Sequence, residues 1–357
     1  MRRIIRDIIH RLKSVRFSSG SLPCLVRVSA WVVLIAGLGW GALGQAGPVE
    51  ATRVLLITAH PDDETLFNLG RFRERGWRMA VALVTNGEQG SVVQGIRRDY
   101  DPRKDEDILL ERTPEPGVRV TRPPGGPRLR EIATPRQLAK QRRREFLAGM
   151  AMHRVARVYF LSAIDHPDFV DGWDIGIQTW DQELLRSRLS AVIQRSSPDI
   201  VITLNPDEVW AHPQHQGLGR LVRQWRQNGL FDRQNGSRPS LYGLREHGWY
   251  PESLAAQAGD EGFDRLASSP VLRQSYADYW RRITSTYMSQ SSHPIWFDAR
   301  ARVGLLPGYG ATDLIRRLDC LGCPGGLTEQ LARHPPNRTL MNRLPRQPRI
   351  FHLARRR

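Results

Sequence analysis

The sequence predicts an α/β protein with a Rossmann-like open sheet, mostly parallel, with helices on both faces. Short apolar runs alternate along the chain with segments of helical pattern, and the sharpest polar motifs directly follow two of those runs. Strand–helix alternation is typical of βαβ units and a parallel sheet. The chain has 357 residues, 40% of them hydrophobic, so a sizeable buried core is expected.

The predicted elements follow one another closely in the first two thirds of the chain. Residues 53–59 form a nearly continuous apolar run, which is typical of a strand buried on both faces. A helix over 65–76 follows, with Gly76 suited to its C-terminal end. The alternation then continues through strand 79–84, helix 137–152, strand 155–161, helix 180–195, strand 200–204 and helix 217–227.

Two regions depart from this pattern. Residues 101–135 contain seven prolines and many charges, so they are interpreted as a long surface insertion. After residue 240 the pattern weakens, and only a helix over 276–287 and an edge strand over 349–353 are predicted. We therefore expect a main domain over 51–300 and a basic C-terminal extension, 301–357, that either completes the domain or follows it.

Residues 1–46 predict a signal peptide or a membrane anchor. A basic leader precedes residues 28–49, which carry no charge. The small residues Gly44 and Ala46 suit signal peptidase cleavage after Ala46. A retained inner-membrane anchor formed by residues 28–49 is the alternative, and a coincidental apolar run is the third interpretation. Positive charge before the apolar run orients the rest of the chain outward, so we expect a periplasmic or secreted protein.

The formal net charge is +17, and the excess is concentrated at the two ends. Residues 1–47 carry seven Lys or Arg and one acid, and residues 341–357 carry six Arg and no acid. Such a balance fits an anionic membrane or envelope surface, or an acidic polymer. Solvated arginines scattered among acids are the alternative, and no nucleic-acid partner is expected.

The three cysteines limit the kinds of disulfide and metal site that the chain can form. Cys24 lies in the leader, which leaves Cys320 and Cys323 as the only cysteines of the body. A single C-x-x-C pair excludes a four-cysteine zinc site. A local disulfide and a free pair in a loop both remain open.

The first chemical motif is His60-Pro61-Asp62-Asp63-Glu64, between the first predicted strand and the first predicted helix. Open α/β sheets place ligands at the carboxyl ends of their strands. Imidazole and carboxylate groups together suit zinc, and the proline stiffens the turn that carries them. The alternative is that Asp62 or Asp63 only caps the helix.

The second motif, His212-Pro213-Gln214-His215, follows the predicted strand 200–204 through a loop and precedes a helix. It therefore also lies at a strand's carboxyl end, so the two motifs can converge on one site. A catalytic zinc needs three protein ligands and one open position. His60, Asp63 and His215 can supply the three, which leaves Asp62 and His212 for acid–base work. A histidine pair without a metal is the alternative.

In this order and spacing, the two motifs resemble the PIG-L/LmbE-like family of zinc-dependent de-N-acetylases. The resemblance covers roughly residues 53–230. It includes Thr85-Asn86-Gly87-Glu88, Arg142-x-x-Glu145 and the block from Ser196 to Gly217, with a weaker echo at Ser289-Gln290. It implies a deacetylase domain over 51–300.

The resemblance also implies roles for matching positions. His60, Asp63 and His215 would hold Zn2+, with Fe2+ as another candidate metal. Asp62 would act as general base, and His212 would stabilise the oxyanion and protonate the leaving amine. Arg142 and Asp165 would bind substrate, although Arg142 could instead be an ordinary arginine on a helix surface.

The implied reaction is hydrolysis of the N-acetyl group of an N-acetylglucosamine-type amino sugar or envelope glycan. Two alternatives stay open: an amidase on a non-sugar acyl amide, and a catalytically vestigial glycan-binding protein. The sequence departs from the family where Gln214 replaces a common Asp, and where the insertion 101–135 falls beside the expected cleft. Family membership alone does not determine the substrate.

Overall fold

The structure is a computed structural model. It describes residues 51–88, 135–165, 172–208, 211–233, 236–245, 259–284, 286–287, 289, 312–319 and 326–353. The predicted leader, the insertion up to residue 134 and all three cysteines lie outside these residues. Within the described part of the chain, no helix is both long and apolar enough to cross a membrane.

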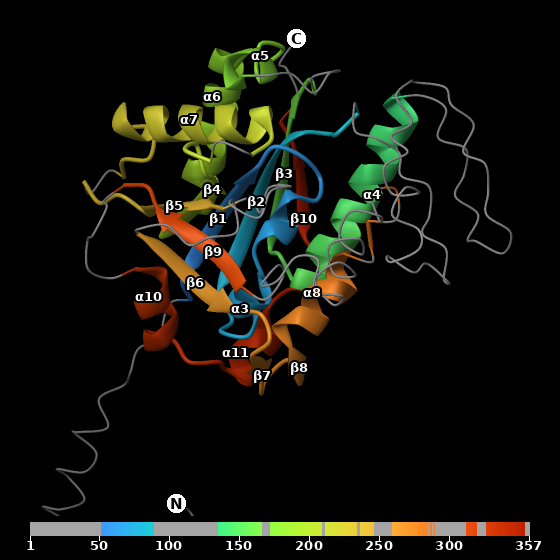
Figure 1. Ribbon diagram of the computed structural model, residues 1–357, viewed down its shortest axis with the longest axis vertical. Helices are drawn as coiled ribbons and strands as arrows, with labels where there is room; N and C mark the ends of the chain where they lie inside the picture. Colours follow the sequence, from blue (N-terminus) through green and yellow to red (C-terminus); the bar gives the residue numbers. More distant parts are fainter. Residues whose placement is uncertain are drawn as a thin grey trace, which may run out of the picture. The chain divides into compact units, whose positions relative to one another are not determined.

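Strands and helices alternate through the first half of the described chain, as the sequence predicts (Figure 1). The elements of this half are β1 (Arg53–Thr58), η1 (Asp63–Leu66), α3 (Gly70–Arg73), β2 (Arg78–Thr85), α4 (Pro135–His153), β3 (Arg157–Ala163), α5 (Trp173–Gly176), α6 (Gln182–Ser196), β4 (Ile200–Leu204) and α7 (Pro213–Gln227). The remaining elements are β5 (Ser240–Leu244), β6 (Asp260–Asp264), β7 (Ser268–Ser269), β8 (Gln274–Ser275), α8 (Tyr276–Thr284), β9 (Thr312–Arg317), α10 (Leu327–Arg333), α11 (Arg338–Arg343) and β10 (Arg349–His352).

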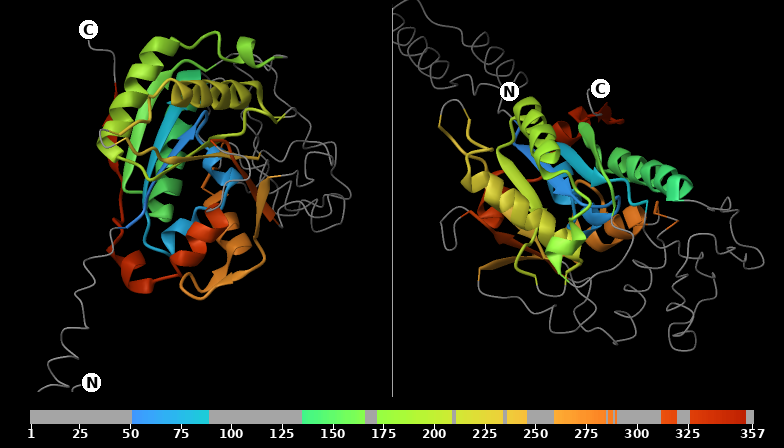
Figure 2. Two further views of the ribbon diagram at one scale, coloured as in Figure 1. Left: turned by 90° about the vertical axis from the view of Figure 1, so that its left-hand side faces the viewer. Right: turned by 90° about the horizontal axis from the view of Figure 1, so that it is seen from above.

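Eight strands form one open sheet in the order β10-β3-β2-β1-β4-β5-β9-β6. The first six of these strands are parallel, whereas β9 runs antiparallel to both β5 and β6. Helices lie on both faces, with α6 and α7 on one and α4 and α8 on the other (Figures 1 and 2). This arrangement confirms the predicted fold class.

The strand order reverses between β1 and β4. From β1 the chain proceeds to β2 and β3 on one side, then crosses back to β4 and β5 on the other. The strands β1 and β4 pair directly, with Val54 opposite Ile200 and Leu56 opposite Ile202. A reversal of this kind opens a crevice beyond the carboxyl ends of the two strands, where open α/β sheets bind ligands.

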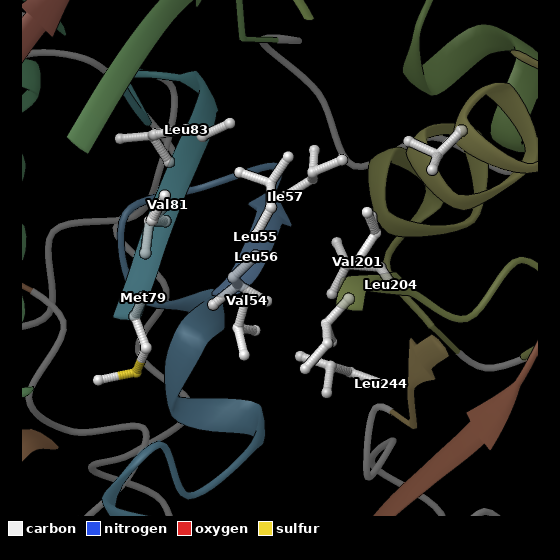
Figure 3. Close-up of a cluster of buried hydrophobic side chains, with 14 of the residues drawn as sticks. Val54, Leu55, Leu56, Ile57, Met79, Val81, Leu83, Val201, Leu204 and Leu244 are labelled. Carbon is white, nitrogen blue, oxygen red and sulfur yellow. The ribbon is translucent and has the colours of Figure 1, made fainter. Parts of the chain in front are cut away.

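The core surrounds the central strands. Residues Val54–Ile57 of β1 are at most 2% exposed, because helices cover both faces of the sheet. Side chains of β1, β2, β4 and β5 meet in one apolar cluster, which includes Leu56, Val81 and Leu204 (Figure 3). The loops at the strand ends are thus attached to a rigid platform.

The helix predicted over 65–76 is wrong as a single element. The structure has the short helix η1, then an extended Phe67, then α3. The side chain of Asn68 accepts a hydrogen bond from the Gly70 N–H, a local bond that competes with helix formation. The helix also ends earlier than predicted, at Arg73, but the turn that follows it closes at Gly76, which has a φ of 70°, and the Trp77 N–H donates to the Phe72 carbonyl.

The C-terminal third contributes more strands than the sequence pattern indicates. The edge strand predicted over 349–353 is confirmed as β10, which pairs with β3. Strands β5, β6 and β9 were not predicted. Four of the five residues of β6 are only partly buried or exposed, so the strand lacks an apolar run. Strands at the edge of a sheet tolerate polar residues, so they lack the apolar run by which a strand is recognised in the sequence.

Candidate metal and catalytic site

The loop after β1 is held in shape by one carboxylate. The Oδ2 atom of Asp63 accepts the backbone N–H groups of Ala59, at 2.8 Å, and of His60, at 2.7 Å. These two bonds close the turn around Pro61 and leave the Oδ1 atom of Asp63 facing the imidazoles. The capping interpretation of Asp63 is therefore incomplete, because only one of its two oxygens contacts backbone.

Three donor atoms converge beyond the ends of β1 and β4. The Nδ1 atom of His60 lies 3.0 Å from the Nε2 atom of His215. The Oδ1 atom of Asp63 lies 3.1 Å from that Nε2 atom and 3.5 Å from the Nδ1 atom of His60. Four tetrahedral ligands at zinc distances of ~2.1 Å would be roughly 3.4 Å apart. The spacing and the N, N, O chemistry of this set therefore fit a zinc ion.

A second candidate set overlaps with the first. Ring nitrogens of His60, His212 and His215 all lie within 4.8 Å of one another. The set with Asp63 is tighter, and it includes an anionic ligand, so we favour His60, Asp63 and His215 as the ligands. His212 then remains beside the metal position rather than at it.

The charges of this set are coupled. Burial alone would lower the pKa of His60, but the carboxylates of Asp63 and Asp165 raise it well above its ordinary value. Burial would raise the pKa of Asp63, but the imidazoles of His215 and His60 hold it well below its ordinary range. A cation therefore occupies this position favourably, either as a proton on the imidazole or as a metal ion.

The carboxylate of Asp62, which is next to this set in the chain, forms an ion pair with Arg142. The Nη2 atom of Arg142 donates to Asp62 Oδ1 at 2.9 Å, and its Nη1 atom donates to the Gly87 carbonyl at 3.1 Å. Desolvation raises the pKa of Asp62, although Arg142 opposes the shift. A side chain at Gly87 would collide with the guanidinium, because an added Cβ would lie 2.5 Å from Nη1. Arg142 is 4% exposed, so it is not an ordinary surface arginine of α4.

The start of α7 brings His212 and His215 into the site, and this helix begins earlier than predicted. The helix starts at Pro213 rather than residue 217, and His212 is its N-cap. The Nδ1 atom of His212 accepts the N–H of Gln214 at 3.2 Å. Since that nitrogen accepts, the ring hydrogen belongs on Nε2. Proline at the first helical position and a capping side chain favour this early start.

The other nitrogen of His60 has two acceptors nearby. Gln214 places its Oε1 atom 2.5 Å from His60 Nε2, and Asp165 places its Oδ1 atom 3.5 Å from the same nitrogen. Asp165 is 3% exposed, and its backbone N–H donates to Glu88 Oε1 at 3.2 Å. The structure thus brings every residue of the predicted site together at one end of the sheet.

Sequence reasoning named Ser289 only as a weak echo of the family, and it missed the contacts that tie Tyr287 and Ser289 to this site. The Tyr287 hydroxyl donates to Glu64, a fully buried residue whose pKa is raised by burial to about 8. Ser289 donates its N–H and its hydroxyl to Glu145, at 2.9 and 2.5 Å. Glu64 and Glu145 belong to motifs that the sequence analysis identified. Their hydrogen bonds with Tyr287 and Ser289 could not be predicted, because each donor lies over 140 residues away from its acceptor in the chain.

Residues 55–226 match the model of the GlcNAc-PI de-N-acetylase (PIG-L) family. Among curated relatives, a 1D-myo-inositol 2-acetamido-2-deoxy-alpha-D-glucopyranoside deacetylase from Corynebacterium urealyticum is 27% identical over 181 residues, which cover 48% of this chain and 47% of the relative. The corresponding protein from Mycolicibacterium gilvum is 28% identical over 177 residues, covering 49% and 54%. The chain spans about half the length of the curated relatives it matches.

Among solved structures, the N,N'-diacetylchitobiose deacetylase from Pyrococcus horikoshii aligns with 80% of this chain and 91% of its own, at 15% identity and a TM-score of 0.45. The matched segment 55–226 contains α4, β4 and most of β1 and α7, which carry or adjoin the candidate residues. Residues 55–226, which carry or adjoin the candidate site, are thus similar to the PIG-L family.

Proposed function

We propose that this chain is a metal-dependent hydrolase that removes the acetyl group from an N-acetylglucosamine-type amino sugar. The observation that carries the proposal is the convergence of His60 Nδ1, His215 Nε2 and Asp63 Oδ1 within 3.5 Å, with the carboxylate of Asp62 in the adjacent position of the chain. The family match and the N-acetylated sugars in the names of the relatives support the sugar as substrate class.

The three converging atoms would hold the metal, and zinc suits their chemistry best. When bound, such a metal acts as a Lewis acid and lowers the pKa of water from ~15.7 towards ~7. Asp63 contributes twice, because its Oδ2 atom maintains the turn while its Oδ1 atom faces the metal position.

Asp62 is the proposed general base. Its carboxyl interacts electrostatically with Asp63, His60 and His215, and Arg142 restrains one of its oxygens. The raised pKa of Asp62 makes it a better proton acceptor than an ordinary aspartate. Arg142 therefore orients the base in this proposal, and a direct role in substrate binding remains a prediction, as it does for Asp165.

His212 is the proposed stabiliser of the oxyanion. With Nδ1 accepting the Gln214 N–H, the neutral ring has an Nε2 hydrogen to donate to the developing negative charge. A neutral imidazole is a poor source of a proton for the leaving amine. Asp62, once it has received the proton of water, is the better placed donor for that second transfer.

Amine release tests the proposal directly. Purified protein loaded with zinc would be incubated with N-acetylglucosamine, diacetylchitobiose, an N-acetylglucosaminyl inositol, an envelope glycan and an N-acetyl amino acid, and free amine would be detected with fluorescamine. We expect release from at least one sugar, loss of release after chelation and strongly reduced release by Asp62→Asn.

Release only from the non-sugar amide would replace the proposal with the amidase alternative. Binding of a glycan with retained zinc and no release from any substrate would favour the vestigial alternative. The relatives' full lengths are only half matched, so the identity of the sugar is left to this panel.

We further propose that the chain is exported, because a basic leader and an uncharged apolar run precede Gly44-Gln45-Ala46. An envelope glycan would then be within reach of the enzyme. A phosphatase reporter fused after residue 357 should be active outside the cytoplasm, and activity only inside would contradict export. Mass spectrometry of the mature N-terminus would separate cleavage after Ala46 from a retained anchor.

A further inference from the structure

Gln214 is a buried side chain with one conspicuous contact. It is 1% exposed and lies on the first turn of α7, next to the proposed ligand His215. Its carbonyl Oε1 lies 2.5 Å from His60 Nε2. Its amide nitrogen has no hydrogen-bond partner among the residues that the structure describes. The carbonyl is therefore the part of this amide that the site uses.

The tautomer of His60 explains that use. A histidine that binds a metal through Nδ1 must carry its hydrogen on Nε2. The atom that faces Nε2 must then be an acceptor, which is what Gln214 Oε1 supplies. Nδ1 is left with its lone pair directed at His215 Nε2 and Asp63 Oδ1, at 3.0 and 3.5 Å.

Two acceptors compete for that single hydrogen. Asp165 Oδ1 is 3.5 Å from His60 Nε2, beyond ordinary hydrogen-bond length, whereas Gln214 Oε1 is at 2.5 Å. A carboxylate at position 214 would lie close to Asp165 across the same ring nitrogen. A neutral amide provides the acceptor without placing a second anion there.

We propose that Gln214 is the positioning residue for His60, which accepts the Nε2 hydrogen with its carbonyl and so aims Nδ1 at the metal. This inference rests on the metal site of the proposed function. It goes beyond that function by assigning the support of His60 to a neutral amide in preference to Asp165. Groups that hold a ligating histidine in this way typically change metal affinity 10–100-fold when removed.

The test measures metal affinity, with no need for a substrate. Gln214→Met keeps length and volume but lacks an acceptor, and Gln214→Glu restores an acceptor on a side chain of the same length. Gln224→Met is the matched control, because Gln224 lies on the same helix and is exposed. Zinc affinity would be measured by competition with a chelating dye, and folding by thermal melting of the metal-free proteins.

We expect Gln214→Met to bind zinc about 10–100-fold more weakly, while Gln214→Glu and Gln224→Met stay within a few-fold of wild type. Equal affinity in Gln214→Met and wild type would overturn the inference. Equal weakening by Gln214→Met and Gln214→Glu would also overturn it, because an acceptor of the same length at position 214 would then not preserve zinc binding. If Gln214→Met does not fold, Gln214→Asn tests the same point, since its carbonyl is one methylene shorter.

The outcome is separable from that of the proposed function. Weakened zinc binding in Gln214→Met supports the inference even if no tested sugar releases amine. Normal zinc binding in Gln214→Met contradicts it even if the wild-type protein is an active deacetylase. A wild-type protein that binds no zinc at all would contradict both.

Discussion

The strand pair β1 and β4 has an aspartate site at each end, and the two sites differ in their partners. At the amino ends, the carboxylate of Asp199 accepts three hydrogen bonds from Arg53: one from its backbone N–H at 2.9 Å and two from its guanidinium at 3.2 and 3.0 Å. It accepts a further hydrogen bond from Arg233 at 2.9 Å. At the carboxyl ends, Asp63 meets two backbone N–H groups and the imidazoles of His60 and His215.

The contrast shows how the same side chain becomes structural or chemical. An arginine is always charged and neutralises Asp199 permanently, so that site needs no ion. An imidazole is charged only when protonated, so the site around Asp63 can exchange its proton for a metal. We therefore expect changes at the carboxyl ends to affect metal and catalysis, and changes at the amino ends to affect only stability.

The largest effect is expected from removing a metal ligand. Asp63→Ala, His60→Ala and His215→Ala should each bind zinc more than ~100-fold more weakly, beyond the 10–100-fold typical of supporting residues. Deacetylation should fall with the zinc. Asp199→Ala is the matched control at the opposite end of the strands and should retain zinc. Three ligand variants with wild-type zinc content under mild chelation would show that the ligand set is wrong.

The next largest effect separates Asp62 from its neighbour. Asp62→Asn keeps the size of the side chain but cannot accept a proton as a carboxylate does. We expect normal zinc binding and a loss of ~10²–10⁴-fold in kcat, the usual range for general-base catalysis. An active Asp62→Asn enzyme at saturating zinc would remove Asp62 as the base and make His212 the next candidate.

A smaller effect is expected at the amino ends, on stability alone. Asp199→Asn weakens the contacts with Arg53 and Arg233, and we expect a loss of about 1 kcal/mol in the free energy of unfolding, because the pair is partly solvated. Urea unfolding of the metal-free protein measures it. Unchanged zinc affinity is the accompanying control, and a loss of zinc in this variant would contradict the contrast between the two ends.

The pH dependence of this loss has a definite sign. Burial would raise the pKa of Asp199, but hydrogen bonds from Arg53 and Arg233 lower it below its ordinary value. A lowered folded-state pKa stabilises the fold above the unfolded value of about 3.9, and the benefit disappears as pH falls through the folded-state value. The difference between wild type and Asp199→Asn should thus be constant near neutral pH, begin to shrink at about pH 4, and vanish only below the folded-state pKa of Asp199.

The smallest effect is expected for Arg53→Lys. Lysine keeps the charge but replaces the two-nitrogen contact with Asp199 by a single ammonium. We expect a loss of a few tenths of a kcal/mol in the same urea experiment, within the range of exposed ion pairs. A loss as large as that of Asp199→Asn would indicate that the paired geometry, rather than the charge, stabilises this end.

Local patterns were sufficient for most of the parallel half of the fold. The run of apolar residues at Val54–Ile57 identified β1, and the strand at Ile200–Leu204 was predicted with the bounds that the structure shows. These strands are buried on both faces, so their consecutive residues are apolar and the strands can be identified from the sequence. Strand β6 has no apolar run, and the hydrogen bond of the Asn68 side chain has no signal in the hydrophobic pattern. Strand β6 and the break in the helix predicted over 65–76 were therefore not predicted.

The sequence by itself predicted which residues would carry the proposed chemistry, because the spacing of His60, Asp62 and Asp63 after one strand, and of His212 and His215 after another, is local information. Only the tertiary structure decided their geometry. His60 and His215 are separated by 155 positions in the chain and are brought together by the pairing of β1 with β4. The direction of each side chain depends on distant partners such as Arg142 and Gln214. Contacts between residues far apart in the chain depend on the packing of whole elements, which no short motif records.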